Sequence, residues 1–288
     1  MRASSIKYNT FVNYIEVLKP RETSLLVFIG ACSAVIAAAG NLRLDVFIMV
    51  IIAVALGSAG CNGLTNYLDR EVDARAMRTR NRAFPSMRVY PAQKTLPLII
   101  GLILAGLFLA YLLSPVCFII GIVGTIASAV WRKTISCTFL GIVAGCSPVL
   151  IGWFAVQPEL NLKIVLICLL LVFWIPLHIW SVMIAHRDDY LGAGLKYFPL
   201  NLRVKDVIKI LFALALFLFA ISICLYVFTD FNVFYFWVAG ILGILMVVAC
   251  ARLLFSGTSK AAWQIYKLSS FPYLGIIFLA MCLDTLLF

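Results

Sequence analysis

Long apolar runs separated by short polar segments dominate the chain. A helix that crosses a bilayer needs about 20 mostly apolar residues, and nine stretches meet this requirement. They lie at approximately residues 24–40, 45–65, 95–113, 115–131, 138–156, 164–185, 208–229, 233–251 and 268–287. Such unbroken runs differ from the weak two-residue alternation of a membrane barrel. The pattern predicts an all-α polytopic membrane protein, with nine transmembrane helices in one bundle and residues 1–288 as a single domain.

Composition agrees with a membrane protein. Hydrophobic residues make up 64% of the 288 residues, charged residues make up 12%, and the mean hydropathy is +1.07. A soluble domain is about half apolar and a quarter charged. The nine cysteines fall mostly inside the apolar stretches and form no C-x-x-C pair. We therefore expect them to be small buried side chains rather than metal ligands.

The basic residues predict an orientation. The chain has 23 Lys and Arg against 12 Asp and Glu, and basic residues gather in cytoplasmic loops. A cytoplasmic N-terminus puts 21 of them inside and leaves only Arg43 and Lys163 outside. Because these cations border predicted spans, they argue against a nucleic-acid partner. We expect an active site facing the cytoplasm, and the absence of an Arg- and Ser-rich presequence favours a prokaryotic plasma membrane over an organellar inner membrane.

Two long polar segments, residues 66–94 and 186–206, follow the second and sixth predicted helices. Asp69 and Asp189 are 120 residues apart, an offset of four helices. A four-helix duplication plus one extra helix would fit this offset. Apart from Asp45 and Lys209 at the ends of two spans, His178 and Asp284 are the only Asp, Glu, Lys, Arg or His residues within the predicted spans. This argues against a coupled transporter, the alternative from a different functional class.

The first polar segment begins with Asn66-Tyr-Leu-Asp69-Arg-Glu-Val-Asp73. Residues three or four apart share a helix face, so Asn66, Asp69 and Asp73 project together over about two turns. Mg²⁺ accepts carboxylate and carboxamide oxygens and completes its shell with water and phosphate. The spacing therefore suits a Mg²⁺ and diphosphate site, although a solvated helix end has the same pattern.

Arginines follow this motif closely, at positions 75, 78, 80 and 82. Guanidinium groups bind phosphate oxygens through paired, charge-assisted hydrogen bonds. Carboxylates, a metal ion and arginines together can stabilise a departing diphosphate. The orientation rule alone accounts for Arg80 and Arg88, whereas Arg78 and Arg82 are the stronger candidates.

The second polar segment completes a pattern of known type. The pieces are Lys19-Pro20-Arg21, Asn66-x-x-Asp69-Arg70-x-x-Asp73, Arg78-Thr79 with Arg82, Gly152-Trp153, Trp174 with His178, and Asp189-Tyr190 with Ala193-Gly194. They resemble the intramembrane aromatic prenyltransferase superfamily over residues 19–200. Within it, the Asp-Tyr pair followed by Ala-Gly is similar to the protoheme IX farnesyltransferase (haem O synthase) branch.

The resemblance implies transfer of a farnesyl group from farnesyl diphosphate to a vinyl group of haem B, with Mg²⁺ as cofactor and a lipid bilayer as surroundings. The expected site has Asp69, Asp73 and Asp189 as catalytic residues, Asn66 with these three aspartates as metal ligands, Arg78, Arg82, Lys133 and Arg187 as diphosphate-binding residues, and Tyr190 as support in the second motif. His178 is either an axial contact to the haem or a buried histidine bonded to a neighbouring helix. A quinone precursor or a lipid is the alternative prenyl acceptor.

Overall fold

The computed structural model describes residues 10–130, 137–195 and 198–288. All regular structure in these ranges is helical. The elements are α1 (Thr10–Val17), α2 (Pro20–Ala38), α3 (Leu44–Arg75), η1 (Ala92–Thr95), α4 (Leu96–Leu113), α5 (Pro115–Val130), α6 (Cys137–Phe154), α7 (Leu162–Ala185), α8 (Arg187–Gly192), α9 (Val204–Phe228), α10 (Val233–Ser256), α11 (Ser259–Leu268), η2 (Ser269–Tyr273) and α12 (Leu274–Leu287).

Seven helical segments in the described residues are long and apolar enough to cross a membrane. These are α2, α3, η1 with α4, α7, α9, α10, and the continuous run from α11 to α12. Helix α5 and residues Thr138–Phe154 of α6 are apolar but shorter. The all-α membrane architecture is thus confirmed, while nine crossings and a cytoplasmic N-terminus stay predictions.

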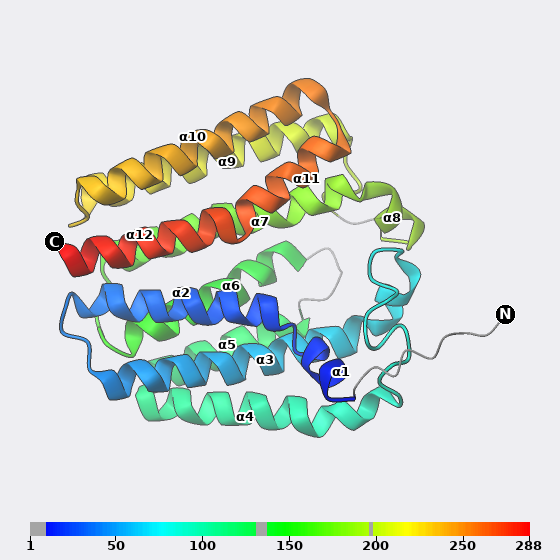
Figure 1. Ribbon diagram of the computed structural model, residues 1–288, viewed down its shortest axis with the longest axis horizontal. Helices are drawn as coiled ribbons and strands as arrows, with labels where there is room; N and C mark the ends of the chain where they lie inside the picture. Colours follow the sequence, from blue (N-terminus) through cyan, green and yellow to red (C-terminus); the bar gives the residue numbers. More distant parts are fainter. Residues whose placement is uncertain (1–9, 131–136, 196–197) are drawn as a thin grey trace.

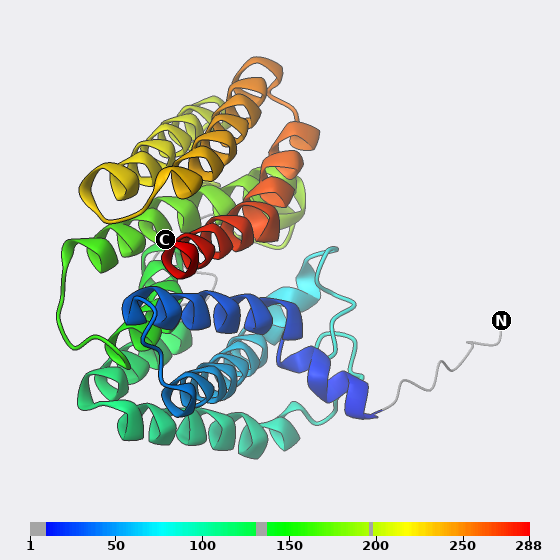
Figure 2. The same cartoon turned by 60° about the vertical axis from the view of Figure 1, so that its left-hand side comes forward.

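The long helices lie side by side along the horizontal direction of Figure 1. Both views place α7 and α12 between the α9–α10 pair and the group formed by α2 to α6 (Figures 1 and 2). Helix α1, residues 76–91 and α8 gather at one end of the bundle, at the right of Figure 1. The two polar segments of the sequence therefore meet at this end, which we call the polar end.

Helix α7 is the central element, since half of its most apolar window is buried inside the protein. Asn161 caps its start by accepting a hydrogen bond from the Ile164 amide at 3.2 Å, which satisfies one of the free amides of the first turn. Apolar side chains on the outer helices are exposed, as lipid contact requires. Examples are Leu104, Phe108, Ile119, Phe217, Trp237 and Ile241.

Small residues bring the helix backbones together. A Cβ atom on Gly152 of α6 would lie 2.1 Å from the Gly30 carbonyl oxygen of α2, and one on Gly106 of α4 would lie 2.6 Å from the Gly57 amide nitrogen of α3. Backbone contact of this kind is typical of membrane bundles, where close packing replaces the hydrophobic drive of water.

Asp284 and His178, the two ionisable residues inside the predicted spans, have specific partners. The carboxylate of Asp284, which is 1% exposed, accepts hydrogen bonds from the amides of Asn232 at 2.8 Å and Tyr235 at 3.0 Å. It thereby caps the start of α10, where amides lack helical partners. Asp284 has a structural role here, whereas His178 lines a cavity described below.

Two helix boundaries depart from the predicted spans. Helix α3 continues ten residues beyond residue 65 and carries the whole first motif, because helical geometry persists after the apolar run ends. At the C-terminal side, α11 begins nine residues before the predicted 268, and the five-residue segment η2, which is kinked at the non-helical Ser270, joins it to α12. Helices α3 and α7, which precede the two polar segments, are the counterparts in the proposed four-helix repeat, which stays a prediction.

Candidate active site

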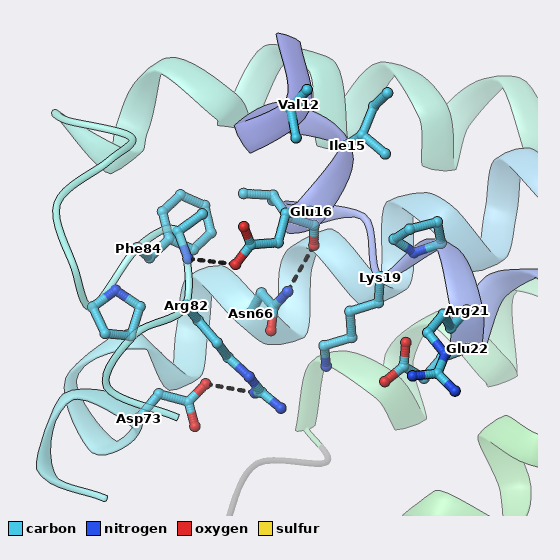
Figure 3. A pocket seen from close by; sticks show the side chains of 14 residues that line it. Val12, Ile15, Glu16, Lys19, Arg21, Glu22, Asn66, Asp73, Arg82 and Phe84 are labelled. Carbon is cyan, nitrogen blue, oxygen red and sulfur yellow. Dashed lines mark hydrogen bonds and ion pairs between the residues drawn. The ribbon is translucent and has the colours of Figure 1, made fainter. Parts of the chain in front are cut away.

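A pocket of about 420 Å³ opens at the polar end between α1, α2, the end of α3 and residues 82–85. Figure 3 shows its charged lining, with Lys19 and Arg82 approaching from different elements and Asp73 beside Arg82. Asn66 and Asp73 both line this pocket, as their seven-residue spacing on one helix face predicts. We call this space the charged pocket.

Asp73 is 1% exposed and is paired with a cation. Its Oδ2 accepts a hydrogen bond from Arg82 Nη1 at 2.9 Å. Its backbone oxygen accepts another from the Thr79 hydroxyl at 2.8 Å. Because removing one partner of a buried ion pair costs about 3–5 kcal/mol, Arg82 and Asp73 hold each other at the pocket wall.

Asn66 presents an unpartnered oxygen. Its Nδ2 donates to the Val17 carbonyl at 2.7 Å, so this contact assigns Oδ1 to the opposite side of the amide. Asn66 is 8% exposed, and Oδ1 has no hydrogen-bond partner among the described residues. Leaving such an atom unsatisfied costs about 1–3 kcal/mol. Asn66 Oδ1 is thus a buried oxygen at the pocket wall whose hydrogen-bonding capacity is unused among the described residues.

Lys19 completes the charged lining of the pocket. It was not among the predicted site residues and appeared only in the Lys19-Pro20-Arg21 motif. It caps the start of α2 with a left-handed backbone, φ 49°, which is uncommon for a residue other than glycine. Burial, with a smaller contribution from the Arg82 guanidinium, lowers the pKa of Lys19 to about 8, although Glu22, Asp73 and Asp69 oppose the change. The signal in the sequence was a lysine at the entrance of the first span.

Asp69 is half-buried and lies close enough to Lys19 to influence its pKa. It is not among the described residues that line the charged pocket. The described residues contain no cluster of three or more His, Cys, Asp or Glu side chains that could hold a metal ion. Asn66 Oδ1 and the Asp73 carboxylate nevertheless suit Mg²⁺, which takes few protein ligands and completes its shell with substrate phosphate and water.

The second motif holds the segment that follows α3. Asp189 Oδ1 accepts a hydrogen bond from the Met77 amide at 2.6 Å, and Oδ2 accepts one from the Arg78 amide at 3.0 Å. The Arg78 Nη2 donates to the Tyr190 hydroxyl at 2.8 Å. Asp189 is thus placed as an anchor for backbone amides, and a metal contact by this residue stays a prediction.

The remaining predicted phosphate ligands have other surroundings. Arg187 donates through Nη2 to the Leu202 carbonyl at 3.3 Å, and it lines neither of the two cavities described here. Lys133 lies outside the described residues. Beside the second motif, burial lowers the pKa of His186, and the Arg78 guanidinium lowers it further. This keeps positive charge on arginines rather than on His186.

Helix α1 also contacts the segment that follows α3, and these contacts were not predicted from the sequence. Arg88 bonds to both oxygens of Glu16, at 2.7 Å each, and to Asn13 Oδ1 at 2.8 Å. Glu16 in turn accepts a hydrogen bond from the Ala83 amide at 3.0 Å. Arg88, attributed above to membrane orientation, therefore ties α1 to the pocket wall.

A second cavity of about 380 Å³ lies within the bundle beside the charged pocket. Lys19, Glu22 and Arg82 line both spaces, so the two adjoin at these side chains. Arg78 also reaches this cavity, while helices α2 to α7 supply a mostly apolar lining. We call this space the apolar cavity.

One wall of the apolar cavity is aromatic. The His178 ring stacks between Trp174, at 4.9 Å between ring centroids, and Tyr266, at 4.6 Å. The kinked segment η2 holds this stack through Ser269. The Ser269 carbonyl accepts a hydrogen bond from Trp174 Nε1 at 2.6 Å, and its hydroxyl contacts His178 Nδ1 at 2.9 Å. We call Trp174, His178 and Tyr266 the aromatic wall.

A bundle of membrane-length helices, with a charged pocket that adjoins an apolar cavity, suits a substrate with an anionic head and an apolar tail. Residues 25–271 match the UbiA prenyltransferase family. The chain therefore belongs to this family.

Individual relatives agree with this assignment. The chain is 33% identical to the protoheme IX farnesyltransferase of Desulforudis audaxviator, over 94% of this chain and 87% of that protein. Solved structures share the fold at lower identity. A digeranylgeranylglyceryl phosphate synthase structure matches with a TM-score of 0.80 and 17% identity, covering 97% of this chain and 99% of the other. An Archaeoglobus fulgidus UbiA homolog bound to GPP and Mg²⁺ matches with a TM-score of 0.68 and 13% identity, covering 96% and 100%.

Proposed function

We propose that the protein transfers a farnesyl group from farnesyl diphosphate to a vinyl group of haem B and so makes haem O. The observation that carries this proposal is the junction of the charged pocket and the apolar cavity at Lys19, Glu22 and Arg82. A prenyl diphosphate has the same division between a charged head and an apolar chain. The name of the Desulforudis audaxviator relative supports farnesyl transfer to haem in particular.

The charged pocket binds the diphosphate and stabilises it as a leaving group. When the bond between the allylic carbon and oxygen breaks, negative charge grows on the diphosphate, and Lys19 and Arg82 lie where they can bind it. Fixed cations in a site with little water stabilise such charge strongly. Asn66 and Asp73 would hold Mg²⁺, which would neutralise part of the diphosphate charge when bound.

The apolar cavity protects the allylic cation from water until the acceptor attacks. The terminal vinyl carbon bonds to the farnesyl carbon, and positive charge moves to the vinyl carbon next to the porphyrin. Water then adds there as hydroxyl and releases a proton, which balances the reaction. The side chains of Trp174 and Tyr266 line this cavity and help to keep it apolar and free of water.

His178 is prepared to contact the acceptor. The Ser269 hydroxyl lies 3.1 Å from the Tyr266 carbonyl and 2.9 Å from His178 Nδ1. In the arrangement where it donates to the carbonyl, its oxygen accepts from Nδ1–H and His178 keeps a lone pair on Nε2. A neutral imidazole with a free Nε2 is the form that binds haem iron, so we propose an axial contact between His178 and haem B.

The polar end would face the cytoplasm of a prokaryotic cell. This placement is supported by the basic residues, which gather beside the first and second motifs. Both substrates would then be drawn from the inner leaflet and the cytoplasm.

The decisive experiment incubates membranes containing the protein with haem B, farnesyl diphosphate and Mg²⁺, and measures haem O by mass. We expect haem O only when all three are present. If diphosphate is released with a quinone precursor or lipid as acceptor and haem O never forms, the acceptor assignment is wrong. If no prenyl donor releases diphosphate with any acceptor, a transporter becomes the better explanation.

The role of His178 is tested by the absorption spectrum of bound haem B. We expect His178→Ala to shift the Soret band and to weaken haem binding. His186→Ala is the matched control, because it removes the other histidine of the chain outside the aromatic wall. An unchanged spectrum and turnover in His178→Ala would exclude the axial contact.

A further inference from the structure

The apolar cavity reaches deep into the bundle, and its far part lies between helices rich in small residues. Gly57 of α3, Gly106 of α4, Gly124 of α5 and Gly145 of α6 all line it. The depth available to an apolar chain therefore depends on which of these glycines could carry a side chain. The structure separates them into two kinds.

Three of these glycines lie against a neighbouring helix. A Cβ on Gly106 would lie 2.6 Å from the Gly57 amide nitrogen, so a side chain there would separate two backbones. A Cβ on Gly124 would lie 2.4 Å from the Ser147 hydroxyl oxygen, and one on Gly145 would lie 2.6 Å from Ile175 Cδ1. At these two positions a neighbouring side chain would have to move.

Gly57 is different. A Cβ built on Gly57 meets no atom within 4 Å, although the residue lies in the interior of a helix, where glycine costs roughly 1 kcal/mol relative to alanine. Its backbone lines the apolar cavity. No neighbouring atom would therefore clash with a side chain at position 57. The feature that a side chain there would change is the open cavity.

The position of Gly57 along α3 matches the far part of the cavity. It lies nine residues before Asn66, which is about 13 Å along the helix axis at 1.5 Å per residue. The charged pocket begins at the level of Asn66. A prenyl chain whose diphosphate occupies the charged pocket therefore has to pass the level of Gly57 with its distal part.

We propose that Gly57 sets the longest prenyl chain that the protein accepts, by leaving the far part of the apolar cavity unobstructed. This assignment rests on the proposed prenyltransferase function. A side chain at position 57 closes the cavity below the charged pocket, so the diphosphate still binds while a long chain no longer fits.

The test measures equilibrium binding of geranyl, farnesyl and geranylgeranyl thiodiphosphate, analogues that ionise slowly, to the purified full-length protein in detergent with Mg²⁺. In Gly57→Leu we expect the affinity for the farnesyl and geranylgeranyl analogues to fall at least about ten-fold, because a close-fitting apolar pocket rejects excess chain length. The affinity for the geranyl analogue should change less than about three-fold, and that for inorganic diphosphate should not change.

Gly101→Leu is the matched control, because Gly101 lies on the exposed face of α4 and an added Cβ there also meets no atom within 4 Å. It should leave all three affinities unchanged. Gly57→Ala provides a second variant with the least disturbance, and it should shift the preference in the same direction by a smaller factor. This variant decides the question if Gly57→Leu fails to bind inorganic diphosphate.

Equal effects on all three analogues, or no effect in either Gly57 variant, would overturn the assignment. The binding test requires no acceptor, so its failure is distinguishable from failure of the proposed function. A wild-type protein that makes haem O while its Gly57 variants keep the wild-type preference refutes only the chain-length role. A wild-type protein that binds the analogues but makes no haem O refutes only the acceptor.

Discussion

The end of α3 and the start of α8 each present aspartates at the polar end, but the two regions use them differently. Asp73 is almost fully buried, faces the charged pocket and pairs with the Arg82 side chain. Asp189 is half-buried and accepts hydrogen bonds from the Met77 and Arg78 amides. The first carboxylate lines the charged pocket, and the second one holds the segment that carries Arg78 and Arg82. Two similar aspartate motifs can thus have different roles, one in a pocket wall and the other in holding a loop.

The strongest test of this comparison is Asp73→Asn. We expect it to lower kcat by about 10²–10³-fold, the scale typical of a lost electrostatic contact to a developing charge. The change removes the charge that pairs with Arg82 and would hold Mg²⁺. The measurement is haem O formation at saturating substrates.

Asp45→Asn is the matched control, since Asp45 lies at the opposite end of α3 and its side chain is 63% exposed. It should keep wild-type activity. If Asp73→Asn retained more than about a tenth of the wild-type rate, the assignment of Asp73 to the catalytic machinery would be wrong.

The second test is Asp189→Asn. We expect a loss of about ten-fold in kcat/KM, because weakening hydrogen bonds to a charged acceptor costs about 1.5–3 kcal/mol at most. The Mg²⁺ concentration for half-maximal activity should stay at its wild-type value, whereas Asp73→Asn should raise it. A Mg²⁺ titration of the three proteins measures both effects. A raised Mg²⁺ requirement in Asp189→Asn would remove the contrast and support a second metal site.

A smaller effect is expected for Tyr190→Phe, which removes the hydroxyl that accepts from Arg78. KM for farnesyl diphosphate should rise by about three- to ten-fold with kcat nearly unchanged, since a single hydrogen bond is lost. Steady-state kinetics distinguish the two parameters. Tyr111→Phe, on the exposed face of α4, should have no effect, and a fall in kcat rather than a rise in KM would contradict a positioning role for Tyr190.

The smallest effect concerns pH. Burial and Arg82 lower the pKa of Lys19 to about 8, so Lys19 is protonated below that pH and loses its charge as the pH rises through it. We expect kcat/KM, which reports the free enzyme, to fall by a few-fold above pH 8. In Lys19→Arg the charge persists, because arginine stays protonated, and this decrease should disappear. An identical pH profile in both proteins would show that Lys19 does not bind the diphosphate.

Sequence patterns predicted much of the fold because they depend on local periodicity. The apolar runs predicted the long helices. The spacing of Asn66, Asp69 and Asp73 predicted that all three share a helix face; Asn66 and Asp73 line the same pocket, whereas Asp69 is not among the residues that line it. The same reasoning ended α3 too early, since it followed hydropathy and the helix continues through polar residues to Arg75.

Other parts of the site depended on contacts that no local pattern contains. Asp189 and Arg78 are 111 residues apart in the chain, and nothing in the second motif distinguishes a backbone anchor from a metal ligand. Ser269 contacts His178, which is 91 residues away in the chain. It lies in the kinked segment η2, which the hydropathy pattern predicted to be part of an ordinary span. Lys19 lines the charged pocket only because the segment with Arg82 lies next to the start of α2.

The sequence by itself determined the membrane-helical class, the polar residues available for a diphosphate and the family, because hydropathy and short motifs are properties of neighbouring residues. Only the tertiary structure decided that Asp73 faces the pocket while Asp189 holds a loop, and that Gly57 borders open space while Gly106 borders a backbone. The physical reason is that a carboxylate or a glycine has no fixed role of its own. The neighbouring atoms, which come from distant segments, decide whether a carboxylate faces a pocket or holds a loop, and whether a glycine borders a cavity or another backbone.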